Sequence, residues 1–156
     1  MSLQSLTYKN TLLRTKRGNS HGVFSNAKPI YLISIIDGIG EGILVGNKIP
    51  FDCNQLVEIY TNNFKIERDR GNALYRVNSK TTPYNLPFFH LNAEPYYHIR
   101  WKDGVLPPKQ ALSPSSRFLR ENVDYAYLDN ELWNLLQVPE TRYDIKNALI
   151  KKFLQP

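Results

Sequence analysis

Cysteine and long apolar runs are the scarcest features of this sequence. Among its 156 residues there is one cysteine, Cys53, so an internal disulfide bond and the paired cysteines of a zinc knuckle are both excluded. No apolar run is long enough to span a bilayer and no signal peptide is recognisable, which favours a cytoplasmic protein with no membrane partner. The length suits one domain that buries its own core, so we expect a single domain over residues 1–156.

Acidic residues are missing from the first 28 positions, although the chain has 14 in all. These positions account for nearly all of the net charge of +6, and their cations are Lys9, Arg14, Lys16, Arg17 and Lys28. Residues 65–80 and 96–120 are also basic, whereas the acids gather in residues 121–144. Ordinary solvated charge is one interpretation. The other is a basic face that binds a polyanion, with an acidic back.

Residues with the spacing of a catalytic or metal site are few. Asp144-Ile145-Lys146 matches half of a common nuclease motif, but it lies in a helical pattern and lacks a partner acid on a strand. The glycines of residues 38–42 end a helix, whereas a phosphate-binding loop would begin one. We therefore expect no catalytic residue, no metal ion and no cofactor in this chain.

The most apolar stretch, residues 30–39, predicts the helix around which the chain folds. Its apolar side chains lie almost all round a helix, which is typical of burial on most faces. Pro29 suits the first turn, Ser25 or Asn26 can cap it, and the glycines that follow end it. The positive end of this helix dipole would point into the preceding basic loop, so we expect an anion there. The polar residues of that site would be Lys16, Arg17, His21 and Lys28.

The rest of the chain predicts an α+β fold, a mostly helical single domain with one aromatic-rich antiparallel β-hairpin. The hairpin is expected from two aromatic runs, residues 86–91 and 96–101, joined by a loop of about four residues. This pairing would put His90 and His98 on opposite faces, where they cannot share a metal ion. Residues 65–84 predict a loop, and further helices are expected at residues 3–17, 52–64, 115–122, 129–137 and 139–154.

Taken in order, several motifs of the chain resemble those of a known family. They are the basic N-terminal residues, His-Gly at 21–22, Ala-Lys-Pro at 27–29, the helix PIYLISIIDGI, then NKIPF, PFFHL and LDNELWNLL. From Arg14 to Leu154 the chain resembles the N-terminal domain of predicted McrA-like restriction endonucleases. In that family the domain precedes an HNH nuclease domain, and its relatives include the sulfur-recognition domain that binds phosphorothioated DNA.

The chain departs from the family pattern at positions that would determine which DNA the domain recognises. The family's Pro-His-Lys-Pro corresponds to residues 26–29, where Ala27 replaces the histidine. A Tyr-Pro pair forms much of the sulfur pocket in the relatives, and Leu86-Pro87 stands in its place, with His90 where a small residue is expected. The resemblance therefore implies DNA binding in general and gives phosphorothioate recognition less support. Since no HNH residues are recognisable, the chain should bind DNA without cutting it.

Charge pattern and resemblance together predict a recognition domain for double-stranded DNA, either plain or modified. Its HNH nuclease would be a partner chain or a C-terminal domain. Tyr84 and His90 are expected to face the ligand while other aromatic residues pack on the core. A metal-dependent nuclease with an unrecognised site and a protein-interaction module with an exposed apolar patch remain the alternatives. The predicted DNA contacts are Arg14, Lys16, Arg17, His21, Lys28, Arg68, Arg70, Tyr84, Leu86, Pro87 and His90.

Overall fold

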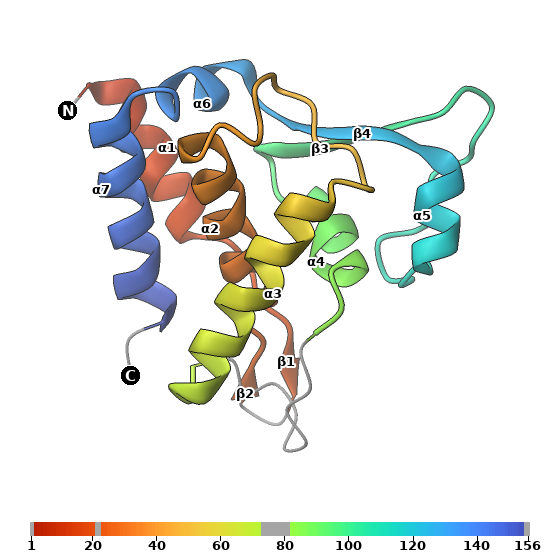
Figure 1. Cartoon of the computed structure of the whole chain (residues 1–156), viewed down its shortest axis with the longest axis horizontal. Coiled ribbons are helices and arrows are strands. Elements are labelled where there is room, and N and C mark those ends of the chain that lie inside the picture. The colour runs from red at the N-terminus through yellow and green to blue at the C-terminus, as the bar shows by residue number, and fades with distance from the viewer. Residues whose placement is uncertain (1, 21–22, 73–81, 155–156) are drawn as a thin grey trace.

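The computed structural model describes residues 2–20, 23–72 and 82–154 (Figure 1). It confirms the α+β class, because helices surround small antiparallel sheets. Within these residues no helix is both long and apolar enough to cross a membrane. In chain order the elements are α1 (Leu3–Leu13), β1 (Asn19–Ser20), β2 (Val23–Phe24), α2 (Ala27–Gly40), α3 (Asn54–Asp69), α4 (Asn85–His90), η1 (Leu91–Ala93), β3 (Tyr97–Trp101), α5 (Ser116–Asn122), β4 (Val123–Leu128), α6 (Asn130–Leu135), α7 (Pro139–Leu149) and η2 (Ile150–Leu154).

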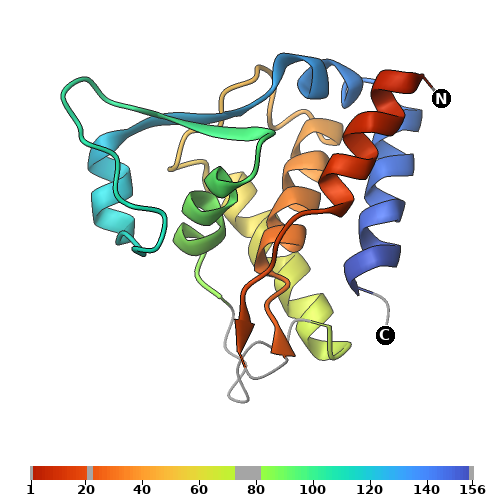
Figure 2. The ribbon, with the colours of Figure 1, turned by 180° about the vertical axis from the view of Figure 1, so that it is seen from behind.

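Helix α2 is the centre of the fold, as the sequence predicts. It contacts α3, α4 and α7 (Figures 1 and 2), and its successive residues Tyr31, Leu32 and Ile33, which point in different directions, are all buried. A helix that is apolar on every side has no solvent face, so its neighbours must enclose it. The chain turns away after the helix at Gly42, whose φ of 75° is left-handed backbone that glycine adopts without strain.

Strand β3 pairs with β4, so the predicted position of the hairpin is wrong. The antiparallel register runs from Tyr97 opposite Leu128 to Trp101 opposite Val123. The sheet is aromatic-rich, as predicted, but its second strand comes from a later part of the chain. A separate two-stranded ribbon, β1 with β2, lies at the other end of the molecule (Figure 1).

The first aromatic run forms α4 instead of a strand. Pro87 has no N–H for a strand ladder but fits the first turn of a helix. In the helix Phe88 and Phe89 are buried, and their rings lie against Tyr97 and Trp101 of β3 respectively. A short aromatic run suits a strand or a buried helix, and contact with α2 selects the helix here.

Helix α3 continues to Asp69, beyond its predicted end. Glu67 explains the continuation, because its buried carboxylate accepts hydrogen bonds from the side chains of Arg70 and Asn72 just after the helix. The prediction of a loop is therefore wrong at its start. Residues 70–72 and 82–84 of the predicted loop lie outside helices and strands, as predicted, and residues 73–81 lie outside the described residues.

The helices of the C-terminal third lie where the sequence places them. Ser115 caps α5 by accepting the backbone N–H of Phe118 at 3.1 Å, and Pro139 occupies the first turn of α7. The last predicted helix divides into α7 and the wider turn η2. Helix α1 ends at Leu13, before its predicted end, and α3 begins at Asn54, after its predicted start at residue 52.

Aromatic rings fill the space between α2, α3, α4 and β3. Tyr31 lies edge-on to Tyr84 and Tyr97, with ring centroids 5.4 and 5.8 Å apart. Its hydroxyl lies 3.0 Å from that of Tyr97, which also donates to the backbone oxygen of Phe88. Burial raises the pKa of all three tyrosines well above the usual value, so they stay neutral and serve the packing of the core.

Candidate nucleic-acid interface

Arg17 lies where segments from both ends of the chain meet. Its guanidinium carbon lies 4.4 Å from the ring centre of Phe24 in β2 and 4.9 Å from that of Phe153 in η2. Its Nη1 donates to Asn26 Oδ1 at 2.8 Å, and Asn26 Nδ2 donates to the backbone oxygen of Asn72 after α3. The segment before β1 therefore meets β2, the end of α3 and η2 at one end of the molecule (Figure 1).

We call this the basic end, because the polar residues that it gathers are mostly cations. In Figure 1 it is the lower end, where the β1–β2 ribbon, the last turn of α3 and η2 lie. Its cations are Lys16, Arg17, Lys28, Arg68, Arg70, Lys151 and Lys152. Most of them are predicted DNA contacts, and the two lysines of η2 add to these. Clustered charge of one sign attracts a polyanion and increases its rate of association.

The anion expected at the start of α2 is supplied in part by the protein itself. Glu94 is buried, and its Oε1 accepts the backbone N–H of Lys16 at 2.6 Å and lies 3.7 Å from Lys28 Nζ. Burial lowers the pKa of the Lys28 ammonium, and the Glu94 carboxylate opposes that shift. Lys28 is therefore held by an internal ion pair. No local pattern in the sequence marks Glu94 as its partner.

Other cations at and near the basic end are exposed. Arg14, Lys16, Lys151 and Lys152 all have exposed side chains. Within the part of the chain that the structure describes, no carboxylate forms an ion pair with any of the four. Their charges are therefore available to phosphate groups.

Arg68 and Arg70, at the end of α3, do have acidic partners. Arg70 Nη1 lies 3.1 Å from Glu67 Oε1, and Arg68 Nε lies 3.6 Å from Asp69 Oδ1. The Arg70 and Asp69 side chains are largely exposed, and water screens ion pairs of this kind. The Arg70 side chain is 66% exposed, so a phosphate can approach its guanidinium while the bond to buried Glu67 remains.

Tyr84 and Pro87 are buried, and the structure leaves neither of them a surface for DNA, contrary to the prediction. The Tyr84 ring packs among Tyr31, Tyr60 and Phe88, so it presents no face to a base. Leu86 is half-buried on the same helix. The prediction put Leu86 and Pro87 on an open ribbon and Tyr84 in the loop before it, whereas Pro87 is buried in α4 and Tyr84 is buried just before this helix.

His90 lies at the end of α4, close enough to Lys28 for the charges to interact. Burial lowers the pKa of His90, and the Lys28 ammonium lowers it further, so the ring is neutral at pH 7. Its Nε2 lies 3.1 Å from Ser113 Oγ, and Gln110 Nε2 donates to its backbone oxygen at 3.2 Å. His90 thus borders the basic end. The other predicted histidine, His21, lies outside the described residues.

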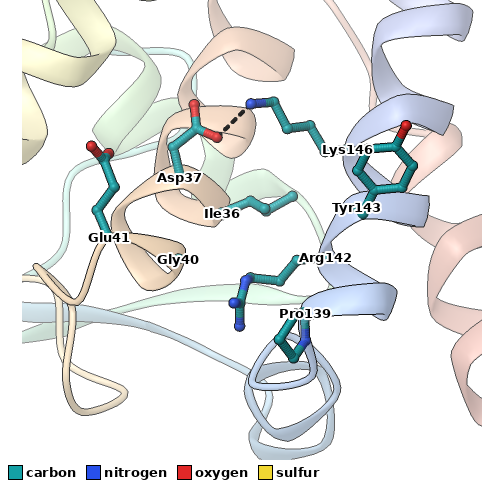
Figure 3. Close-up of a pocket in the computed structure, with 8 residues that line it drawn as sticks. All are labelled: Ile36, Asp37, Gly40, Glu41, Pro139, Arg142, Tyr143 and Lys146. Atoms are coloured by element: carbon teal, nitrogen blue, oxygen red, sulfur yellow. Dashed lines mark hydrogen bonds and ion pairs between the residues drawn. The ribbon is translucent and has the colours of Figure 1, made fainter.

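A hollow of about 450 Å³ lies between the end of α2 and the start of α7 (Figure 3). Lys146 Nζ lies 2.7 Å from Asp37 Oδ1 there, and Asn63 donates to the other oxygen of Asp37. Arg142 donates to the backbone oxygen of Leu136 at 2.9 Å. Asp37, Arg142 and Lys146 are therefore engaged with the protein itself, and a ligand that bound to them would have to displace those bonds.

The two ends of the Asp144-Ile145-Lys146 motif belong to different ion pairs. Asp144 pairs with Lys9 of α1, and Lys146 pairs with Asp37 of α2. Both pairs hold α7 against its neighbours. Across the described residues, no group of three or more His, Cys, Asp or Glu side chains is placed to hold a metal ion.

A cluster of partly exposed side chains lies outside the predicted set of site residues. It occupies the face of the β3–β4 sheet that is turned away from α4, and we call it the tyrosine face. Its members are Lys48, His98, Arg100, Tyr125 and Tyr127. From Tyr125 to Leu128 the residues of β4 alternate between partly exposed and buried positions, and this period of two is the sequence signal that places both tyrosines on one face.

Because comparison with known proteins assigns no family to this chain, its function has to be argued from the surfaces described above. A scan of the sequence against protein-family models finds no match, and a search of the curated proteins finds no relative.

Proposed function

We propose that this domain binds double-stranded DNA through its basic end, as the recognition part of a modification-dependent restriction endonuclease. The observation that carries the proposal is the gathering of exposed cations from distant segments, among them Lys16, Arg70 and Lys151, at one end of the molecule. The resemblance to the N-terminal domain of McrA-like endonucleases supplies the nuclease context. In this proposal the cut is made by an HNH part outside these 156 residues.

Duplex DNA suits the basic end because its phosphates form closely spaced rows of negative charge. Lys and Arg side chains that reach those rows release condensed counterions, and such contacts position a protein without reading sequence. Exposed lysines, such as Lys16 and Lys152, are the contacts that can adapt to the rows. Arg17 and Lys28 lie deeper and add to the local potential while they hold the fold.

In this proposal α4 recognises the modified group, because this helix lies next to the residues that contact the phosphates. Leu86 is half-buried there, and the neutral ring of His90 lies near Lys28. In the proposal these two side chains form an apolar wall and a polar ring that meet the modified group. Buried Pro87 and Tyr84 contribute by holding α4 in place.

Fluorescence anisotropy of a labelled duplex at several salt concentrations tests the proposal. Lys16→Gln/Arg70→Gln removes two exposed cations from the basic end, so the slope of log affinity against log salt should fall by about 1.8. At about 50 mM salt the affinity should fall at least tenfold. The matched control is Lys102→Gln/Lys109→Gln, which removes two exposed cations after β3.

The control pair changes the net charge by the same amount and should leave the slope almost unaltered. Equal losses in both double variants would show that net charge, and not the basic end, determines binding. An affinity of the unmodified protein that does not change between about 50 and 200 mM salt would exclude phosphate contacts altogether.

A further inference from the structure

The tyrosine face is one side of a sheet whose other side packs on the core. Tyr97, Ala126 and Leu128 point to the core and are fully buried. Successive side chains of a strand point to opposite faces, so His98 and its cross-strand partner Tyr127 lie on the open side. Both are only partly buried.

Rings and cations form a continuous row across this open side. The rings of His98 and Tyr127 have centroids 5.1 Å apart at an interplanar angle of 36°, and those of Tyr125 and Tyr127 lie 5.9 Å apart. Arg100 lies opposite Tyr125, with its guanidinium carbon 5.8 Å from the centre of that ring.

Lys48 reaches the same row from a third segment. Ile49 forms an antiparallel bridge to Ala126, with backbone hydrogen bonds of 2.7 and 2.8 Å, so this segment extends the sheet on the free edge of β4. Ile49 is buried, and its neighbour Lys48 turns to the open side with Nζ 5.0 Å from the ring centre of Tyr125. Three adjacent segments thus present two tyrosines flanked by cations.

We propose that the tyrosine face binds single-stranded nucleic acid. Unpaired bases stack on Tyr125 and Tyr127, and Lys48 and Arg100 contact the phosphates. Proteins that bind single strands combine aromatic platforms on open sheets with cations that follow the backbone, and this face has both. Bases inside a duplex are already stacked on their neighbours, so the ligand must carry unpaired nucleotides.

Core packing does not account for these rings. The core tyrosines Tyr31 and Tyr60 are fully buried and lie edge-on to each other, whereas Tyr125 and Tyr127 remain partly exposed on a sheet surface. Partly exposed aromatic rings beside cations leave apolar surface in contact with water. A stacked base would cover that surface.

Asp124 and Asp129 lie beside the tyrosine face, and neither carboxylate blocks access to it. Asp124 lies 3.4 Å from Arg100, and because these side chains are 50% and 61% exposed, a phosphate can replace the carboxylate. Asp129 lies 2.6 Å from His98 Nε2 and accepts a hydrogen bond from the Tyr8 hydroxyl at 2.9 Å. These contacts engage the edge of the His98 ring, whereas the Tyr127 ring lies beside it at 36°.

The tyrosine face and the basic end lie at opposite ends of the molecule, the sheet at the top of Figure 1 and the β1–β2 ribbon at the bottom. A duplex on the basic end would not cover the tyrosine face. The inference therefore does not rest on the proposed function, and the two surfaces are tested with different ligands.

Titration of a labelled oligothymidylate of about 12 nucleotides, followed by fluorescence anisotropy, tests the inference. Tyr125→Ala/Tyr127→Ala should bind about 30-fold more weakly, because stacked bases lose their platform. Tyr125→Phe/Tyr127→Phe keeps the rings and should bind within about twofold of the unmodified protein. Tyr143→Ala is the matched control, since Tyr143 is an exposed tyrosine of α7 and its loss should change nothing.

No loss in the double alanine variant, or an equal loss in Tyr143→Ala, overturns the inference. If the double alanine variant melts at a much lower temperature, Lys48→Gln/Arg100→Gln replaces it. That pair should weaken binding about tenfold, and an unchanged affinity is equally decisive against the site. Lys16→Gln/Arg70→Gln should bind oligothymidylate normally, which separates a failure here from one at the basic end. Oligouridylate of the same length shows whether RNA or DNA is preferred.

Discussion

The basic end and the tyrosine face both carry cations, but the partners of these cations differ. At the basic end Lys28 pairs with buried Glu94, and Arg17 lies over the rings of Phe24 and Phe153. On the tyrosine face Arg100 is largely exposed and pairs with an exposed acid. Cations of a basic surface thus divide into those that hold the fold and those that stay available to a ligand. Burial of both the cation and its partner, as in the Lys28–Glu94 pair, distinguishes the first kind from the second.

The largest effect should follow from neutralising Glu94. In Glu94→Gln the half-buried Lys28 ammonium loses its counter-charge, which should lower the free energy of unfolding by about 3 kcal/mol. Urea denaturation measures the change. The matched control is Glu121→Gln, which breaks an exposed pair with Arg117 and should cost about 0.5 kcal/mol or less. Equal stability of the two variants would contradict a structural role for Lys28.

The pH dependence of the Glu94→Gln defect identifies Lys28 as its source. Burial lowers the pKa of Lys28 in the folded protein below the usual 10.5. Between the folded value and 10.5 the unfolded chain binds more protons, so stability rises with pH in that window. Loss of the Glu94 charge lowers the folded pKa further. The defect should therefore be largest near pH 7 and shrink towards about pH 10, and a constant defect would point to another cause.

Arg17→Ala should have the next largest effect, again on folding. It removes the contacts with two aromatic rings and a charged hydrogen bond to Asn26, which together contribute about 2 kcal/mol. Thermal and urea denaturation measure the loss, and Arg14→Ala, at an exposed position, should change stability by about 0.5 kcal/mol or less. If Arg17 is instead a phosphate contact, as the sequence alone suggests, its loss should weaken duplex binding and leave stability unchanged.

Sequence patterns identify the elements whose signals are local. The structure confirms the apolar helix α2 and the helices expected at residues 115–122 and 139–154, whose signals act within a turn or two, as the Ser115 cap of α5 and Pro139 at the start of α7 do. Strand pairing is not local, because β3 meets β4 across an intervening segment that contains α5. Phe88 and Phe89 fit a strand or a buried helix equally well, and only tertiary contact selects between them.

For the candidate site too, some features can be predicted from the sequence and others cannot. Clustering of cations near the N-terminus is visible in the sequence, and in the structure Glu94 joins two of these residues, through the backbone N–H of Lys16 and the ammonium of Lys28. Glu94, which engages Lys28, comes from the turn before β3, and no spacing rule connects the two. Exposure of Tyr125 likewise depends on which face of β4 the core covers. A shift of register by one residue would reverse that face, so the sequence of one strand alone cannot decide it.

The smallest predicted effect is also the one that best distinguishes binding at the tyrosine face from binding at the basic end. Lys48→Gln removes one cation from the tyrosine face, and the slope of log affinity for oligothymidylate against log salt should fall by about 0.7, with about a threefold loss of affinity near 100 mM salt. The loss stays small because Tyr125 remains available for stacking. Duplex affinity should not change, since the basic end keeps all of its cations. Anisotropy titrations of both ligands with the same protein preparation measure this, and a parallel loss for duplex and single strand would mean that one surface binds both.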